Sequence, residues 1–309
     1  AAVPAAAYVL MQASRGVASA SASASTAAVA ARLEPFDYDG VKLLDSRWLR
    51  QYQAGRDVYF NVSDDDILHG YREAAGLPAP GKALGGWCRK TSDTVFGQWL
   101  SGMARMYRAT GDQGMKEKAV GLLHEWAKTV GPDGDCRMDT YAYDKLVCGL
   151  VDLQLYAGVS EAIPLLEKVT DWADRTFSRA RTLRSPSDPT AYYGLPSEWY
   201  TLSENLYRAY QLTNDTKFQT FAEVWLYHDY WNKFANTSLP NDAQGAHAYS
   251  HVNTFSSAAK TYEVTGDEKY LTICKNAWNY IQNTQCFATG GYGPSERFVT
   301  PDGSLGNSL

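Results

Sequence analysis

A short phrase that recurs about every fifty residues constrains the fold of this chain more than any other feature. Tyr107-Arg-Ala-Thr-Gly-Asp112 returns as Tyr210-Gln-Leu-Thr-Asn-Asp215 and as Tyr262-Glu-Val-Thr-Gly-Asp267. A shorter copy, Tyr156-Ala-Gly158, falls between the first two, and consecutive tyrosines lie 49, 54 and 52 residues apart. A fixed spacing of this size indicates stacked supersecondary units that bury their apolar faces against one another.

Each copy of the phrase predicts the end of one helix and the start of the next. The glycine or asparagine can adopt the left-handed conformation that ends a helix, and the aspartate can cap the helix that follows. Apolar residues recur at helical spacing on both sides of the phrase, as at Phe96, Leu100, Met103 and Tyr107. No comparable strand pattern runs through residues 60–285. The sequence therefore predicts an all-α domain of helical hairpins.

The periodicity predicts four hairpins and one further helix. The hairpins are 64–75 with 91–109, 113–129 with 140–157, 160–180 with 197–212, and 215–233 with 247–264, and the last helix is 267–285. Such hairpins can form an open solenoid or close into a toroid, with an inner ring of helices inside an outer one. A helix without a partner leaves an apolar face unburied, so we expect the architecture to be incomplete at the C-terminus.

The first 33 residues are set apart by their composition. Ala1 to Met11 is apolar, and the alanines and serines that follow are typical of a signal-peptidase site. We interpret residues 1–33 as an export-signal remnant with an Ala/Ser-rich linker, and residues 34–309 as one truncated helical domain. This predicts a periplasmic or secreted protein that begins near residues 20–31. The alternative is a disordered linker alone. No other stretch reaches 18 apolar residues, so no membrane span is expected.

Charge and cysteine content exclude several classes of function. The formal net charge of -5 argues against a nucleic-acid partner, which requires a basic surface. The five cysteines include no CxxC pair, so no zinc ribbon or redox motif is expected. Nine tryptophans and 21 tyrosines suit either sugar stacking or helix packing, and packing is the more frequent role of a single ring. The sequence gives no indication of the oligomeric state.

Polar side chains occur at similar heights on the second helix of each hairpin. Gln98, Asp144, Glu198, His247 and His251 precede their phrase tyrosines by 9 to 15 residues, which is roughly 14–22 Å along a helix. In a ring of hairpins they would gather at one rim of the central cavity as substrate-binding residues. For the two acidic residues, helix N-terminal capping is the alternative. The two histidines lack the acid of an HExxH motif, so sugar recognition or hydrogen bonding is favoured over a metal site.

A glycine-rich loop at 287–298 carries the candidate catalytic residue. Glu296 follows three glycines and a proline, directly after a predicted helix. A phosphate-binding loop is a poor fit, because no strand precedes the loop and no lysine follows its glycines. A glutamate held over a cavity suits a general acid, whereas a solvated surface glutamate is the alternative.

An ordered series of motifs resembles a known family. The motifs are Phe96–Gly102, Tyr107–Asp112, Asp144–Asp152, Ala246–Ala248 and Ala288–Glu296. Together they are similar to glycoside hydrolase family 127 (GH127), the β-L-arabinofuranosidase family, over about residues 40–309. The resemblance implies an (α/α)6 toroid, incomplete in this chain, with β-sandwich material after it. It also implies a carbohydrate substrate of plant type and a retaining mechanism that uses a Glu acid/base and a zinc-bound Cys thiolate.

The family roles carry over to particular positions. Glu296 matches the acid/base and His247 a sugar-contacting histidine, while Glu198 lies near a substrate-facing segment. Gln98 and Asp144 stand where many relatives have histidine, which puts the sugar in doubt. The zinc ligands, one Glu and three Cys, are expected after Leu309. We therefore expect no metal ligands in this chain and no activity from it alone.

Two other functions are alternatives to a GH127-like glycosidase. Another toroid enzyme, such as a polysaccharide lyase, an unsaturated-uronide hydrolase or a sugar epimerase, would share the architecture. A lyase would need a cation for the uronate, and Arg297 is a candidate. A noncatalytic helical-repeat protein that binds through its concave surface would tolerate the loss of the Glu296 carboxylate.

Overall fold

The computed structural model describes residues 38, 42–85, 95–179 and 198–299, and within these ranges the regular structure is helical. The helices are α2 (Arg47–Asn61), α3 (Asp64–Ala74), α4 (Val95–Thr110), α5 (Gln113–Ala127), α6 (Thr140–Ala157), α7 (Ala162–Thr176), α8 (Leu202–Thr213), α9 (Thr216–Val224), α10 (His228–Trp231), α11 (Ala248–Thr265) and α12 (Glu268–Tyr280). In the same ranges β-pairing is limited to isolated bridges. The predicted export segment, 1–33, lies outside the described residues.

The recurring phrase ends and begins helices as predicted. The side chains of Asp112, Asp215 and Asp267 accept backbone N–H groups at the starts of α5, α9 and α12. Asn214 and Gly266 follow α8 and α11 in the left-handed conformation. Each cap satisfies helix-end groups that would otherwise have no partner.

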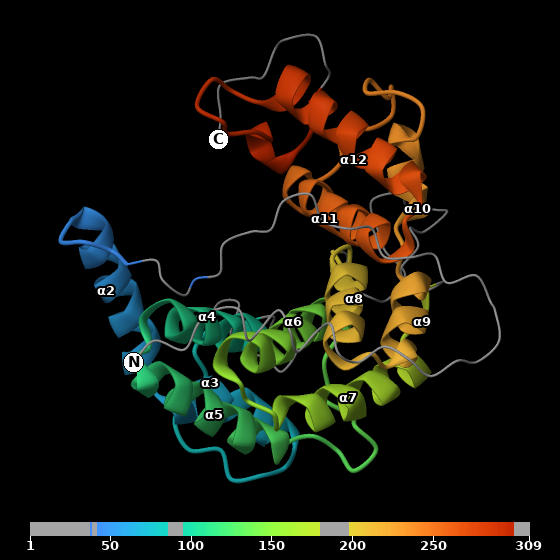
Figure 1. Cartoon of the computed structure of the whole chain (residues 1–309). Helices are drawn as coiled ribbons and strands as arrows, with labels where there is room; N and C mark the ends of the chain where they lie inside the picture. The colour runs from blue at the N-terminus through green and yellow to red at the C-terminus, as the bar shows by residue number, and fades with distance from the viewer. Residues whose placement is uncertain (1–37, 39–41, 86–94, 180–197, 300–309) are drawn as a thin grey trace, which may run out of the picture.

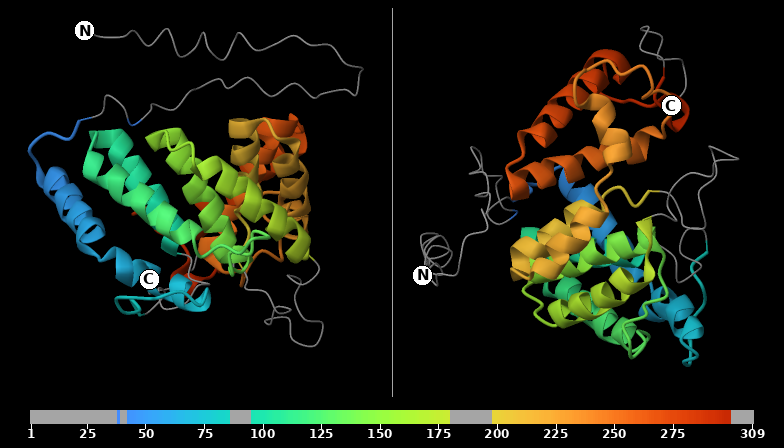
Figure 2. Two further views of the ribbon diagram at one scale, coloured as in Figure 1. Left: turned by 90° about the horizontal axis from the view of Figure 1, so that it is seen from below. Right: turned by 90° about the vertical axis from the view of Figure 1, so that its right-hand side faces the viewer.

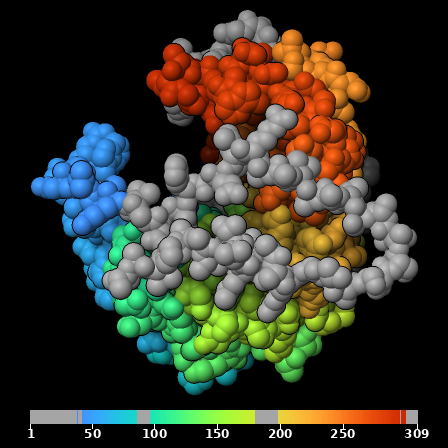
Figure 3. All heavy atoms as spheres, in the orientation of Figure 1, coloured from blue at the N-terminus to red at the C-terminus, as the bar shows by residue number. Residues whose placement is uncertain are grey.

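Successive hairpins form an arc with two layers of helices. α4, α6, α8 and α11 contact one another in chain order along the concave side, and α5, α7, α9 and α12 pack behind them (Figure 1). Seen from below, the hairpins follow one another from α2 to the C-terminal helices (Figure 2). The space-filling view shows the arc open between α2 and the red C-terminal segment (Figure 3). The predicted all-α class, a toroid-type array of hairpins, is confirmed. The expectation that the last helix lacks a partner is wrong, because α12 packs on α11 and buries Tyr270, Ile273, Ala277 and Tyr280.

Two glycines bring α4 and α6 into backbone contact. A Cβ atom on Gly97 would lie 2.0 Å from the Lys145 carbonyl oxygen, and one on Gly149 would lie 2.4 Å from the Gly97 carbonyl oxygen. No side chain fits at either position, because real Cβ atoms do not approach backbone this closely. The glycines therefore set the spacing of these two inner helices.

Large aromatic side chains fill the space between the two layers. Trp126, Trp199, Trp225 and Trp231 are almost completely buried. One apolar cluster extends from α3 to α9, and a second joins α10, α11, α12 and Phe298. The preference for core packing over sugar stacking is confirmed for these four rings.

One predicted helix is broken. The expected helix at 215–233 ends at Val224, because Trp225 leaves the helical conformation and its buried ring packs into the core. The chain resumes as the short α10. The last predicted helix, 267–285, changes to a π-helix at Ile281–Gln285. Among the described helices, none has the length and apolar character required to cross a bilayer.

Candidate active site

Three of the predicted site residues meet at one end of the arc. His247 Nδ1 lies 2.6 Å from a carboxylate oxygen of Glu198, and His247 Nε2 lies 3.4 Å from a carboxylate oxygen of Glu296. Glu198 precedes α8, His247 is the N-cap residue of α11, and Glu296 belongs to the loop after α12. Consecutive members of this set are 49 residues apart in the sequence, and the hairpin array brings all three together. We call this cluster the rim triad.

The contacts of His247 fix the proton on its ring. Nδ1 lies 2.6 Å from a Glu198 carboxylate oxygen and forms a hydrogen bond with the Ser250 hydroxyl at 3.0 Å. A carboxylate oxygen this close to Nδ1 favours a proton on that nitrogen, because the carboxylate can only accept. In the neutral imidazole Nε2 is then an acceptor, and it faces Glu296. A protonated Glu296 can donate to Nε2, and an ionised one can accept from it if the ring is doubly protonated. The triad thus gives Glu296 a partner in both of its protonation states.

Glu296 is presented on a tightly built loop. Its side chain is 83% exposed, and its backbone is left-handed with φ 59°. Glycine is required at 293, because a Cβ there would lie 2.6 Å from that of Ala248 at the start of α11. The Phe298 N–H donates to the Ala246 carbonyl, which holds the loop against the segment before α11. The loop therefore aims the carboxylate at the rim.

Both glutamates of the rim triad have strained backbone. Glu198 has φ 82°, so two of the few described non-glycine residues with positive φ belong to this cluster. Left-handed backbone is unfavourable for a side chain with a Cβ and is retained where the surroundings impose it, often at functional sites.

A polar cavity of about 620 Å³ lies beside the rim triad along the inner helices. It is lined by Gln98, Ser101, Gly102 and Arg105 of α4, Lys145, Cys148 and Tyr156 of α6, Thr201, Glu204, Asn205 and Arg208 at α8, and Tyr249, Asn253 and Ser256 of α11. Tyr249 connects it to the triad, since its ring centroid lies 5.6 Å from that of His247. Gln98 is exposed and lines this cavity, and its predicted contact with substrate stays a prediction.

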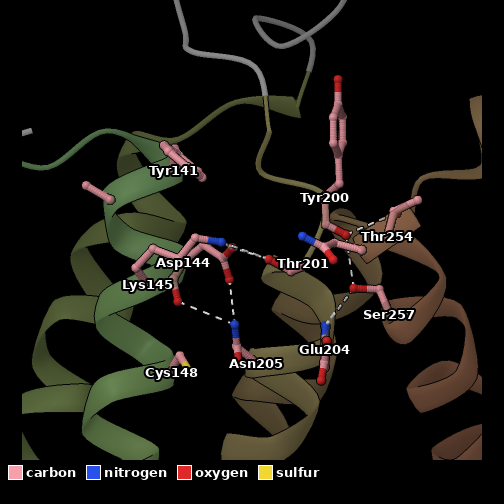
Figure 4. A network of polar contacts seen from close by, with 12 residues as sticks. Tyr141, Asp144, Lys145, Cys148, Tyr200, Thr201, Glu204, Asn205, Thr254 and Ser257 are labelled. Atoms are coloured by element: carbon pink, nitrogen blue, oxygen red, sulfur yellow. Dashed lines mark hydrogen bonds and ion pairs between the residues drawn. The ribbon is translucent and has the colours of Figure 1, made fainter. Parts of the chain in front are cut away.

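Asp144 does not face the cavity. Its side chain has no exposed surface, and it accepts from Asn205 Nδ2 at 2.7 Å, from Lys145 Nζ at 3.0 Å and from the Thr201 hydroxyl (Figure 4). The expected direct substrate contact is corrected to an indirect role. Asp144 holds Lys145 and Thr201, which do line the cavity.

A second buried carboxylate anchors the deeper part of the inner helices. Asp152 has no exposed surface and accepts from Arg105 Nε at 2.8 Å, from Ser101 at 2.6 Å and from Arg208. Lys145 is also held in its charged form: burial lowers its pKa, but Asp144 outweighs this and raises the value above normal. Burial raises the pKa of the Cys148 thiol. The wall of the cavity thus carries fixed cations and a protonated thiol.

His251 lies behind the triad. It is 2% exposed, and its Nδ1 donates to the His247 carbonyl at 2.9 Å while Tyr227 donates to its Nε2 at 3.3 Å. The prediction that both histidines gather at one rim is wrong, because His247 is a cap residue with extended backbone (ψ 109°) and His251 is a buried residue of α11. His251 instead lines a separate, smaller cavity.

Comparison with known proteins identifies the family. The family model of the GH127 β-L-arabinofuranosidase catalytic domain matches residues 40–134 and 121–306. The chain belongs to this family. No curated protein matches the chain.

Solved structures of GH127 enzymes share the fold. The GH127 β-arabinofuranosidase BT3674 superposes with a TM-score of 0.64 at 18% identity over 86% of this chain. Ara127N, a GH127 β-L-arabinofuranosidase from Geobacillus stearothermophilus T6, gives 0.61 at 17% identity over 84%. This chain spans 46% and 48% of their lengths. A GH76 α-mannanase from Bacteroides thetaiotaomicron gives 0.50 at 16% identity, covering 85% of this chain and 89% of its own.

The zinc that the GH127 resemblance implies does not fit the described residues. Within the described ranges, no three His, Cys, Asp or Glu side chains are grouped so as to hold a metal ion. The cysteines there are separate free thiols, and burial raises the pKa of Cys136 to about 12 and that of Cys274 to about 11. We derive no chemical step through zinc from this chain.

Several residues that line the cavity were not predicted from the sequence. Lys145, Asn205 and Arg208 line the cavity, but none of them was singled out. Their signal is spacing: Thr201, Asn205 and Arg208 recur every three or four residues among apolar positions, as one helix face requires. A row of polar residues along one face of an otherwise buried helix predicts that this face lines a solvent-accessible cavity.

Proposed function

We propose that the protein is a retaining glycoside hydrolase that releases β-L-arabinofuranosyl units from a plant-type oligosaccharide or glycan, with Glu296 as its general acid and base. The observation that carries the proposal is the rim triad: an exposed glutamate on a strained backbone, 3.4 Å from an imidazole that Glu198 orients. Membership of the GH127 catalytic-domain family supports the choice of sugar.

The triad suits both proton transfers of a retaining reaction. Protonated Glu296 donates to the glycosidic oxygen as the bond to the anomeric carbon breaks, which supplies a neutral leaving group. The resulting carboxylate then takes a proton from water as water attacks the glycosyl intermediate. His247, with Nδ1–H directed to Glu198, keeps Nε2 facing the carboxyl group throughout. The nucleophile implied by the resemblance, a zinc-bound Cys thiolate after Leu309, stays a prediction.

The cavity beside the triad accounts for substrate binding in this proposal. Its 620 Å³ lie within the range of about 300–1,000 Å³ typical of small-ligand sites. Gln98 and Asn253 offer amide groups that can both donate to and accept from sugar hydroxyls. Such uncharged donors and acceptors suit a neutral sugar.

Substitution of Glu296 by Gln tests the proposal in the protein as it is encoded. Gln keeps the size of the side chain but cannot transfer the proton, so we expect turnover of an alkyl β-L-arabinofuranoside to fall about 10²–10⁴-fold. A dinitrophenyl arabinofuranoside, which needs no protonation to leave, should lose far less in bond cleavage, measured by its pre-steady-state burst. Glu268→Gln, on the exposed start of α12, is the matched control and should retain full activity.

Two results would contradict the proposal. Equal losses for the alkyl and dinitrophenyl substrates would remove the acid role from Glu296. An unsaturated uronide or an epimerised sugar among the products, identified by NMR, would instead assign the fold to a lyase or an epimerase.

A further inference from the structure

One aromatic side chain lies between the polar cavity and the rim triad. Tyr249 lines the cavity, and it follows His247 by two residues, in the first turn of α11. Tyr249 is 44% exposed, whereas the large rings between the helix layers are almost completely buried. Core packing therefore does not account for a ring at this position.

Two contacts hold the Tyr249 ring in place. Its centroid lies 5.6 Å from that of His247, with the two rings at 76° to each other. Its hydroxyl forms a hydrogen bond of 3.1 Å with the hydroxyl of Tyr141, in the first turn of α6. These contacts restrict the ring and leave much of its surface open. A side chain that is ordered before its ligand arrives loses little conformational entropy on binding.

The partner hydroxyl of Tyr141 is fixed in turn. Lys145, one turn further along α6, places Nζ 4.9 Å from the centroid of the Tyr141 ring (Figure 4). Burial raises the pKa of Tyr141, and the hydrogen bond with Tyr249 raises it further. Tyr141 therefore stays protonated around neutral pH, and the bond between the two hydroxyls persists there.

The position of Tyr249 indicates which part of a glycan it meets. In the proposed reaction Glu296 protonates the glycosidic oxygen, which joins the arabinosyl unit to the rest of the glycan. Tyr249 contacts His247, and His247 faces Glu296, so the Tyr249 ring lies beside the bond that breaks. The polar lining of the cavity suits the hydroxyls of the arabinosyl unit. The rest of the glycan extends toward solvent, and it passes exposed surface such as this ring.

The exposed part of the ring suits the C–H groups of a sugar. Amphipathic aromatic rings stack on the apolar faces of sugars and keep their hydroxyl in water or bonded to a partner. Such stacking does not depend on one pattern of hydroxyl groups. It therefore suits the leaving group of a glycan, whose sugar can vary, better than the arabinosyl unit.

We infer that Tyr249 binds the leaving-group sugar, the glycosyl unit on the other side of the scissile bond from the arabinosyl unit, by stacking on its C–H face. This inference rests on the proposed function. It makes Tyr249 a specificity-determining residue, because the ring favours a glycan over an arabinofuranoside that carries only a small alkyl group.

Two substrates that share the arabinosyl unit test the inference in the protein as it is encoded. One is a β-L-arabinofuranosyl-L-arabinose disaccharide, and the other is methyl β-L-arabinofuranoside, which lacks a second sugar. Tyr249→Ala should lower kcat/KM about tenfold for the disaccharide, mainly by raising KM, and at most about twofold for the methyl glycoside. Tyr249→Phe keeps the ring and loses only the bond to Tyr141, so its loss on the disaccharide should not exceed about threefold.

Trp278→Ala is the matched control. Trp278 is a ring with 65% exposure on α12, and it does not line the polar cavity. Its removal should leave kcat/KM for both substrates unchanged.

The outcomes separate this inference from the proposed function. Equal losses on the two substrates in Tyr249→Ala, or a loss in kcat alone, would overturn it and assign the effect to the contact with His247. If the native protein hydrolyses neither substrate, the proposed function fails, and an NMR titration with the disaccharide decides on Tyr249. A higher Kd in Tyr249→Ala than in the native protein would then support the stacking contact. Equal Kd values, or no binding to either protein, would overturn it.

Discussion

The inner wall of the arc and its rim use the same kinds of charged residue in opposite ways. On the wall, Asp144 and Asp152 have no exposed surface and are bound by several donors from neighbouring helices. On the rim, Glu296 is 83% exposed and its backbone is strained. Carboxylates that are buried and saturated with donors hold helices at a fixed spacing. A carboxylate that is exposed and held by one partner remains able to exchange a proton.

The largest expected effect comes from breaking the wall. Asp152→Asn removes the anion that Arg105 and Arg208 share, so we expect the free energy of unfolding to fall by about 3–5 kcal/mol. The exposed pair of Asp171 with Lys217 provides the control: Asp171→Asn should cost about 1 kcal/mol or less. Urea unfolding measures both. Equal small losses would show that the wall does not depend on its buried charge.

A smaller effect is expected from Glu198 on the rim, in catalysis. Glu198→Gln removes the anion that fixes the Nδ1 proton of His247, so kcat should fall at least about tenfold, or ~1.4 kcal/mol, with little change in KM. The kcat–pH profile should also change, which a purely structural role would not cause. Glu263→Gln, on the exposed side of α11, is the control. An unaltered pH profile would exclude the positioning role.

Backbone strain at the rim predicts a gain in stability. Glu296→Gly and Glu296→Ala both remove the carboxylate, but only glycine relieves the left-handed backbone. The glycine variant should therefore unfold with a free energy about 1 kcal/mol above that of the alanine variant. Thermal unfolding compares the two. Equal stability would mean that this backbone is unstrained, and the contrast with the wall would then rest on exposure alone.

The smallest expected effect is a pH dependence of the free energy of unfolding. It arises from a residue outside both the inner wall and the rim. Burial lowers the pKa of His228, whose ring bonds to Tyr270 at 2.8 Å. Because the folded value is below the unfolded one, the contribution to stability is complete above about pH 6.5. It is lost as the pH falls through the lower, folded value. His228→Gln should flatten the stability profile in this window, as measured by urea unfolding at each pH. A profile unchanged by the substitution would contradict this assignment.

The fold was largely predictable because its determinants are local. Caps such as Asp215 and helix ends such as Asn214 act within a few residues, and apolar spacing marks the buried faces. The break in the helix at Trp225 was not predictable. The free energy that favours it comes from burial of the Trp225 ring against residues that are distant in the sequence.

The candidate site was predictable only in part. Equal heights on successive helices indicated that Glu198 and His247 would share a rim, and the glycine loop indicated Glu296. The error at His251 arose because a cap residue does not obey helical spacing. The roles of Asp144 and Asp152 could not be read from one sequence, because a buried carboxylate is defined by donors on other helices.

The contact between α4 and α6 bears on how wide the hollow is. With hydrogen in place of a side chain at Gly97 and Gly149, the two backbones touch. A single methyl group at either position would clash with the facing backbone and push α4 and α6 apart. The width of the concave side therefore depends on two positions, 97 and 149, where the side chain is a single hydrogen atom.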